Sequence, residues 1–181
     1  MFTACGLLAV TACSSGGESA DNRPTHASAS SNPAPATSSA GADSQEAAKA
    51  AVLQAYSRYW QEQAKAYAQA DIKGTELTKY ATKKALTRAM GDVLVMKKAG
   101  TSTTGAPGHQ SQVTSLTLTG KIPKATLRDC LDISTWKTVK NGKVQPFPSN
   151  QPLRYVTTTK AEKWGKQWMI TESTPDGSRT C

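Results

Sequence analysis

The chain has 181 residues, with 22 Lys and Arg against 13 Asp and Glu, giving a formal net charge of +9. This length predicts one domain, with room for a tail. The positive excess favours anionic neighbours such as lipid headgroups, cell-wall polyanions or an acidic protein, although scattered lysines also serve to keep a secreted protein soluble. No recognisable nucleic-acid-binding module accompanies the charge, so nucleic acid is not an expected partner.

The N-terminus has the character of an export signal. Residues 1–12 contain a short apolar run followed by small residues, which suit a signal peptidase, and the run is far too short to span a bilayer as a helix. Val10-Thr11-Ala12-Cys13 resembles the bacterial lipobox, in which the cysteine becomes the first residue of the mature protein and carries lipid. The resemblance implies lipidation of Cys13 and anchoring to the outer face of the cell membrane. No Lys or Arg precedes the apolar run, so either the true start lies upstream of Met1 or export itself stays open.

The segment after Cys13 has the composition of a tether. Residues 14–43 contain no Val, Ile, Leu, Met, Phe, Trp or Tyr, so nothing in them offsets the entropy of ordering the chain. A flexible coil of this length reaches roughly 30 Å. We therefore divide the chain into a signal peptide at residues 1–12, a lipidated cysteine with a disordered tether at 13–43, and a folded domain at 44–181.

Two cysteines, Cys130 and Cys181, remain in the folded part of the chain. In an oxidising compartment such a pair most simply forms a disulfide. A reactive thiol pair is the lesser alternative, because the Cys-x-x-Cys spacing is absent. A zinc site is disfavoured because the sequence has only two histidines, one of them in the tether, and no metal or cofactor is expected.

Apolar and aromatic residues recur at helical spacing in the first half of the domain. Asp43 or Ser44 is a plausible N-cap for a helix that runs to about Ala70. Its predicted buried face consists of Val52, Tyr56, Tyr59, Trp60, Gln63 and Tyr67. A second helical pattern with a bend near Ala81 ends before Gly100, and its apolar positions are Leu77, Tyr80, Ala81, Ala85, Leu86, Met90, Val93 and Met96. The opposite face carries a basic cluster that suits anionic headgroups or simply solvent, made of Lys79, Lys83, Lys84 and Arg88.

The second half of the domain alternates between apolar and polar residues, which predicts strands. The expected strands cover residues 113–119, 125–133, 136–140, 144–147, 153–161 and 167–172. Asn141-Gly142 is a strong signal for a two-residue hairpin turn. Helices followed by antiparallel strands predict an α+β domain, with two to three N-terminal helices packed on a curved antiparallel sheet.

This element order resembles the nuclear transport factor 2-like cone fold. The segments 125–132 (ATLRDCLD) and 164–168 (WGKQW), with the terminal Cys181, are similar to secreted lipoproteins of that superfamily. The resemblance implies a long helix across the concave face of the sheet and a conical pocket. It leaves homodimerisation through the sheet open. Because the fold hosts isomerases, dehydratases and many non-catalytic modules, it does not supply a function.

Asp129 is the one candidate catalytic residue. Alternation places it on the inward face of its strand beside Leu127 and Leu131, where a buried carboxyl group could act as a base or could simply be hydrogen-bonded. Catalytic cones usually pair an Asp with a His, but His109 is expected in a loop after Gly105 and not on a strand.

An aromatic set predicts either a ligand pocket or plain core packing: Tyr56, Tyr59, Trp60, Tyr67, Tyr155 and Trp168. We therefore expect a membrane-anchored, non-catalytic module that binds a small apolar ligand or an envelope protein. The alternative is an isomerase or dehydratase that uses Asp129.

Overall fold

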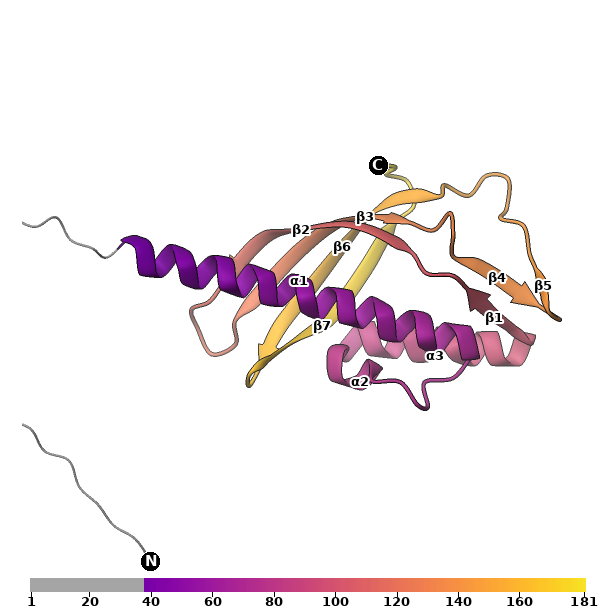
Figure 1. The fold of residues 1–181 in the computed structure, drawn as a ribbon, viewed down its shortest axis with the longest axis horizontal. Helices are drawn as coiled ribbons and strands as arrows, with labels where there is room; N and C mark the ends of the chain where they lie inside the picture. Colours follow the sequence, from indigo (N-terminus) through magenta and orange to yellow (C-terminus); the bar gives the residue numbers. More distant parts are fainter. Residues whose placement is uncertain (1–37) are drawn as a thin grey trace, which may run out of the picture. The chain divides into compact units, whose positions relative to one another are not determined.

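The computed structural model describes residues 38–181, in which three helices precede seven strands (Figure 1). The elements are α1 (Ser38–Gln69), α2 (Leu77–Tyr80), α3 (Lys83–Ala99), β1 (Thr101–Thr104), β2 (Gly108–Thr117), β3 (Lys124–Asp132), β4 (Lys137–Lys140), β5 (Lys143–Val144), β6 (Arg154–Trp164) and β7 (Gln167–Asp176). The predicted α+β class is confirmed. The signal peptide, Cys13 and most of the predicted tether lie outside the described residues.

Helix α1 begins at Ser38, so the predicted boundary near Ser44 is wrong. The segment that was assigned to the tether has no large apolar residue, but it leads into Ala-rich sequence, and alanine has the highest helix propensity. Once the buried part of α1 is formed, each further residue adds a hydrogen bond without a new nucleation cost. Helix propagation therefore extends α1 beyond the part that packs on the sheet.

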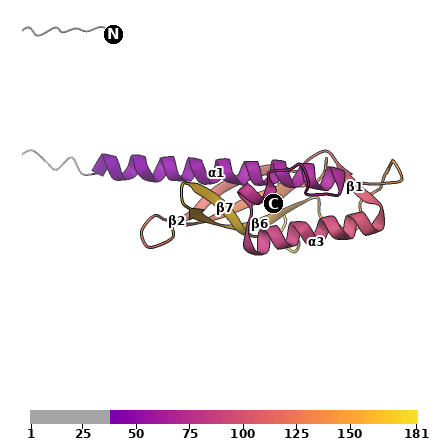
Figure 2. The same cartoon turned by 90° about the horizontal axis from the view of Figure 1, so that it is seen from below.

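The predicted inward face of α1 is confirmed. All six residues at helical spacing are buried: Val52, Tyr56, Tyr59, Trp60, Gln63 and Tyr67. Figure 2 shows α1 lying along one face of the strands, and it contacts β2, β7 and β1. The aromatic stripe of this helix therefore forms one wall of the core.

The second helical pattern breaks at the predicted bend. Ala81 is extended, and it forms a β-bridge with Ile170 of β7, to which the amide of Thr82 also donates a hydrogen bond of 2.9 Å. In α3 the buried stripe is narrow, with Ala85, Ala89 and Val93 at four-residue spacing. Met90, an apolar position of the predicted helical pattern, lies beside this stripe and is 46% exposed, so it is not part of the core.

The basic cluster on these helices is largely neutralised by acidic residues. Its lysines Lys79, Lys83 and Lys84 pair with Glu76, Glu162 and Glu172. Two of these acidic partners belong to β6 and β7, so the lysines join α3 to the sheet. Most of the positive charge that the sequence assigned to this face is therefore paired within the protein and is less available to lipid headgroups.

The strands form two antiparallel sheets. One has the order β2-β3-β6-β7, and the other has the order β1-β4-β5. Register shifts at Val113/Ser115 and Lys160/Ala161 mark bulges, which bend the strands that contain them. The predicted hairpin turn at Asn141-Gly142 is confirmed, with positive φ at both residues. Strand β1, with the sequence Thr-Ser-Thr-Thr, has no apolar alternation and was not predicted.

The core lies between the helices and the four-stranded sheet. Inward positions of β3 alternate strictly, with Ala125, Leu127, Asp129 and Leu131 buried. The same residues face α1 because every second side chain of a strand points to one side. No helix in residues 38–181 is long and apolar enough to cross a membrane.

Gly105 occupies a position that no other residue fits. Its φ is +76°, and a Cβ built there would lie 2.1 Å from the carbonyl oxygen of Thr135. We expect Gly105→Ala to lower the free energy of unfolding by about 2–3 kcal/mol, through backbone strain and this clash. Gly142→Ala is the matched control, because φ is +72° but the space is open. Urea unfolding checks both variants, and equal losses would contradict the clash.

Candidate functional site

A cleft with two adjoining chambers opens beside α1 and α3. The outer chamber has a volume of about 440 Å³ and the inner one about 190 Å³. Four residues line both chambers: Tyr67, Asp92, Trp136 and Tyr155. The two chambers therefore adjoin through these side chains, and together they are called the cleft. Its size falls within the range usual for small-molecule sites.

The predicted aromatic pocket is brought together in part. Tyr59, Trp60, Tyr67 and Tyr155 line the cleft. Tyr56 is fully buried and is absent from the lining. Trp168 lies in the wall of a separate depression with Ala51, Arg58 and Tyr80.

The lining residues that the sequence did not assign to a pocket include Arg88, Asp92 and Trp136. Trp136 lies just after β3 and stacks on Tyr67, with ring centroids 5.5 Å apart, and it meets Trp60 edge to face at 5.9 Å. Arg88 and Asp92 are one turn apart on α3. Helical spacing places them on one face, but only the position of α3 beside the sheet turns that face to the cleft.

Unpaired polar atoms collect around this cleft. In the described part of the chain, seven buried side-chain polar atoms have no hydrogen-bond partner. Five of them belong to residues that line the cleft: Trp60, Gln63, Thr103, Trp136 and Thr157. Buried polar groups in proteins are nearly always paired, with water or ligand if not with protein. The walls of the cleft therefore contain indole donors and oxygen acceptors that the protein itself leaves unpaired, each of them covered by neighbouring atoms.

The tyrosines of the cleft are neutral donors. Burial raises the pKa of Tyr67, and the adjacent Asp92 carboxylate raises it further, while the Tyr67 hydroxyl donates to Asp92 Oδ2 at 2.5 Å. Burial also raises the pKa of Tyr59, an effect that nearby Arg88 partly offsets. At neutral pH the phenols therefore keep their protons, and they contribute hydrogen bonds without charge.

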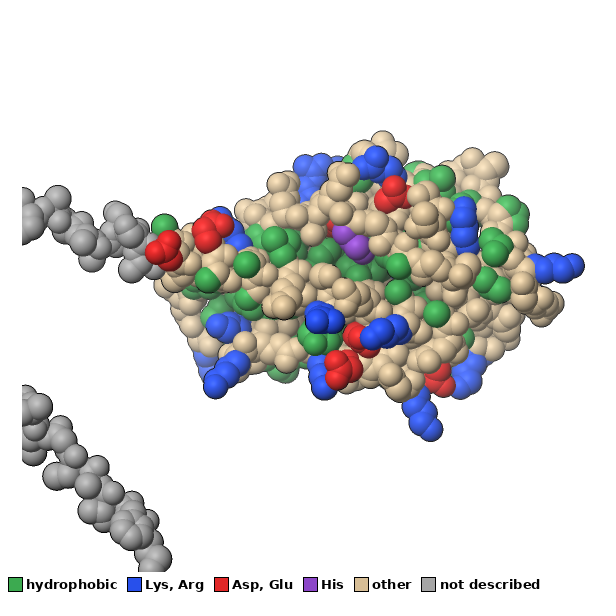
Figure 3. Space-filling view, viewed as in Figure 1, with side chains coloured by type: hydrophobic (Ala, Val, Ile, Leu, Met, Phe, Trp, Pro, Cys, Tyr) green, Lys and Arg blue, Asp and Glu red, His purple; other side chains and the backbone are tan. Residues whose placement is uncertain are grey.

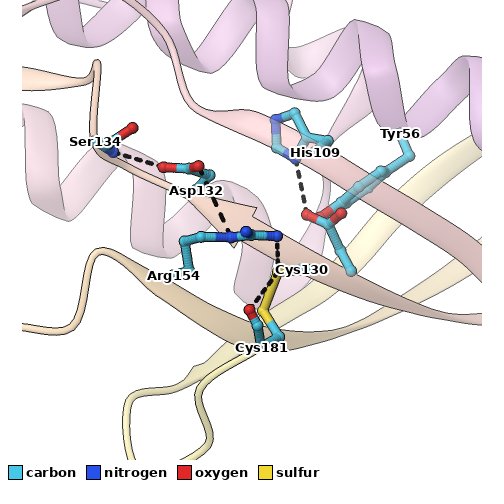
Figure 4. Close-up of a disulfide and its surroundings, with 8 residues drawn as sticks. Tyr56, His109, Cys130, Asp132, Ser134, Arg154 and Cys181 are labelled. Carbon is cyan, nitrogen blue, oxygen red and sulfur yellow. Dashed lines mark hydrogen bonds and ion pairs between the residues drawn. A yellow bond between two sulfur atoms is a disulfide. The ribbon is translucent and has the colours of Figure 1, made fainter.

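Asp129 is buried, as predicted, but it belongs to a different polar cluster under α1. Its Oδ2 accepts a hydrogen bond of 3.0 Å from the Tyr56 hydroxyl and lies 2.8 Å from His109 Nδ1 (Figure 4). The expectation that His109 lies in a loop is wrong, because β2 begins at Gly108 and includes it. The Gly-rich sequence before it suggested a turn, but pairing with Leu131 of β3 extends the strand to this point.

His109 connects this cluster to a second, smaller hollow. Its Nε2 has no partner among the described residues, and its side chain is 22% exposed, which Figure 3 colours purple among hydrophobic side chains. The hollow has a volume of about 210 Å³ and is lined by Ser57, Trp60, Gln61, Ala106, Pro107 and His109. Asp129 lines neither this hollow nor the cleft. The sequence prediction of an inward carboxyl group is confirmed, but the group does not reach a chamber.

The predicted disulfide between Cys130 and Cys181 is present, with an S–S distance of 2.12 Å. Cys130 alternates with Asp129 along β3, so it faces away from α1 (Figure 4). Arg154 donates to Cys130 Sγ at 3.3 Å and also pairs with Asp132. Among the described residues, no group of three or more His, Cys, Asp or Glu side chains is placed to hold a metal ion.

Comparison with known proteins does not indicate a function for this cleft. No family model and no curated protein matches the sequence. Among solved structures, the chain is similar to the intermembrane space region of the chloroplast protein ARC6, with 16% sequence identity and a TM-score of 0.42 over 68% of this chain and 92% of that one. A likeness at this level carries no argument about function, and the site is interpreted from its own residues.

Proposed function

We propose that the chain is an extracytoplasmic lipoprotein whose domain binds a small amphipathic molecule in the cleft. The observation that carries the proposal is the gathering of unpaired polar atoms around an aromatic-walled cleft. In a cleft with no binding role, the buried donors and acceptors of the wall would be expected to pair with one another. Aromatic walls with a few convergent polar groups are typical of ligand sites.

Fluorescence titration with N-phenyl-1-naphthylamine tests the binding. This neutral, largely apolar probe carries one N–H donor and brightens when it leaves water, and we expect saturable enhancement with one probe per chain. Trp136→Ala removes the ring shared by both chambers, and it is expected to weaken binding at least about tenfold, because stacking and burial of this ring are lost. Trp164→Ala is the matched control, since Trp164 is exposed and lines neither chamber. Equal effects of the two substitutions would count against the cleft.

The anchoring part of the proposal rests on the sequence around Cys13 and on the disulfide, which is consistent with an oxidising compartment. The test is the intact mass of protein purified from its native membrane. Cleavage before Cys13 with added acyl chains is the expected result. An unprocessed, unacylated chain would remove the anchor and leave the ligand site to be explained in another compartment. An anionic envelope surface or an envelope protein as partner remains part of this proposal.

One observation supports the alternative that the protein is an isomerase or dehydratase: Asp129 contacts His109. This is the residue pair that catalytic members of the cone superfamily use. It ranks second because Asp129 lines neither chamber, so no substrate atom has a route to it within the described geometry. Proton transfer in a β,γ-unsaturated ketone, followed by absorbance of the conjugated product, tests it. Equal rates for buffer, wild type and Asp129→Asn would reject this alternative.

A further inference from the structure

We infer that the outer chamber binds an organic ammonium ion, with Asp92 as its counter-charge and the rings of Tyr67, Trp136 and Tyr155 around it. This inference rests on the proposed function and names the class of ligand. Cations are attracted to the faces of aromatic rings, most strongly where water is excluded. Asp92 is an exposed residue at this chamber, and its carboxylate beside the rings adds a full charge of the opposite sign.

Asp92 is unusual among the carboxylates of this basic protein. Within residues 38–181, every other Asp or Glu side chain except Asp43 lies within 4.0 Å of a Lys, Arg or His nitrogen. Lys and Arg residues outnumber Asp and Glu residues in this protein, so the lack of an ion pair at Asp92 is not due to a shortage of basic side chains. Arg88 lies one turn away on the same helix, yet it makes no ion pair with Asp92. The charge of Asp92 is therefore available to a ligand.

The rest of the outer chamber favours a cation with an apolar body. Among the described residues that line it, Asp92 is the only one with a charged side chain. Arg88 lines the inner chamber alone. The ammonium of Lys137 lies 4.3 Å from the ring centroid of Phe147, so one cation of the protein itself already lies over an aromatic ring of this chamber.

The unpaired donors narrow the ligand class further. The indole nitrogen of Trp136 and the hydroxyl of Thr103 are buried and have no protein partner. The indole nitrogen is covered in this structure, so a rotation of the Trp136 side chain is needed to bring it to the chamber surface, where an ammonium ion that also carries a hydroxyl or carboxylate oxygen would satisfy it. The site therefore suits a small quaternary ammonium compound with one oxygen function, either free or as the headgroup of a lipid.

Choline and 3,3-dimethyl-1-butanol test the inference, because they have nearly the same shape and differ in the positive charge. Binding is followed by the indole N–H resonance of Trp136 in the full domain. We expect choline to bind at least about tenfold more tightly than the neutral alcohol. Phosphocholine as a third probe separates the sources: tighter binding than choline indicates a lipid headgroup, and weaker binding indicates a free ammonium compound.

The decisive variant is Asp92→Asn, which keeps an oxygen for the Tyr67 hydroxyl and removes the charge. The preference for choline is expected to fall to about one, while the neutral alcohol binds as before. Asp43→Asn is the matched control, since Asp43 is the other carboxylate without an ion pair in the described residues and lies outside the cleft. Equal affinities of wild type for choline and the alcohol would overturn the ammonium inference while leaving the proposed function standing. Failure of N-phenyl-1-naphthylamine to bind as well would overturn both.

Discussion

Asp129→Ala is expected to lower the free energy of unfolding by about 3–5 kcal/mol, because it leaves the remaining members of a buried polar cluster without their partner. The Asp129 side chain is fully buried, and its Oδ2 accepts a hydrogen bond from the Tyr56 hydroxyl and lies 2.8 Å from His109 Nδ1. Burial raises the pKa of Tyr56, so its hydroxyl stays protonated and needs an acceptor. The substitution also leaves a cavity beneath α1.

The control for this prediction is Asp132→Ala, on the same strand. Asp132 is partly exposed and pairs with Arg154 at 3.8 Å, and a surface ion pair of this kind contributes about 0–1 kcal/mol. Asp129→Asn keeps an acceptor for Tyr56 and is expected to fall between the two. Urea unfolding followed by circular dichroism measures all three variants. Similar losses for Asp129→Ala and Asp132→Ala would show that the cluster under α1 does not stabilise the fold.

Loss of the Cys130–Cys181 disulfide is the second large expected effect. The bond closes a loop with a sequence separation of 51, for which the chain-entropy model gives a stabilisation of about 4 kcal/mol. It also holds the C-terminal segment over β6, where the amide of Val156 donates to the carbonyl of Arg179 at 2.8 Å. Val156 is buried although it points away from the main core, so release of this segment also exposes an apolar side chain.

We expect the double variant Cys130→Ser/Cys181→Ser to lose about 3–4 kcal/mol of unfolding free energy. Dithiothreitol provides an internal control, since it should destabilise the wild type by a similar amount and leave the double variant unchanged. Because the bond lies on the face of the sheet away from α1, binding of the probe in the cleft should persist in the reduced protein below its unfolding temperature. A reduced wild type as stable as the oxidised one would contradict the prediction.

Local periodicity was sufficient to predict much of this fold. The aromatic stripe of α1, the bend at Ala81 and the inward position of Asp129 each follow from the spacing of side chains along one element. The hairpin at Asn141-Gly142 follows from the preference of these residues for positive φ. Each of these features is decided within about ten residues of sequence.

The features that were missed depend on contacts between distant elements. His109 becomes part of a strand only because β3 pairs with it, and it meets Asp129 across that pairing. Strand β1 is formed from polar residues that gain their hydrogen bonds from β4. Asp92 was not recognised as a site residue because the aromatic rings beside it belong to α1 and to the segment after β3, which are distant from it in sequence. Identification of the site therefore required the tertiary structure, whereas most helices and strands could be predicted from the sequence.

Tryptophan indole N–H resonances, recorded during titration with N-phenyl-1-naphthylamine, test the central claim most directly. The chain has four tryptophans, of which Trp60 and Trp136 line the cleft and Trp164 and Trp168 do not. The account predicts saturable shifts of the Trp60 and Trp136 signals, with those of Trp164 and Trp168 unchanged. Shifts confined to Trp164 or Trp168, or no shift in any of the four at saturating probe, would contradict a ligand site in the cleft.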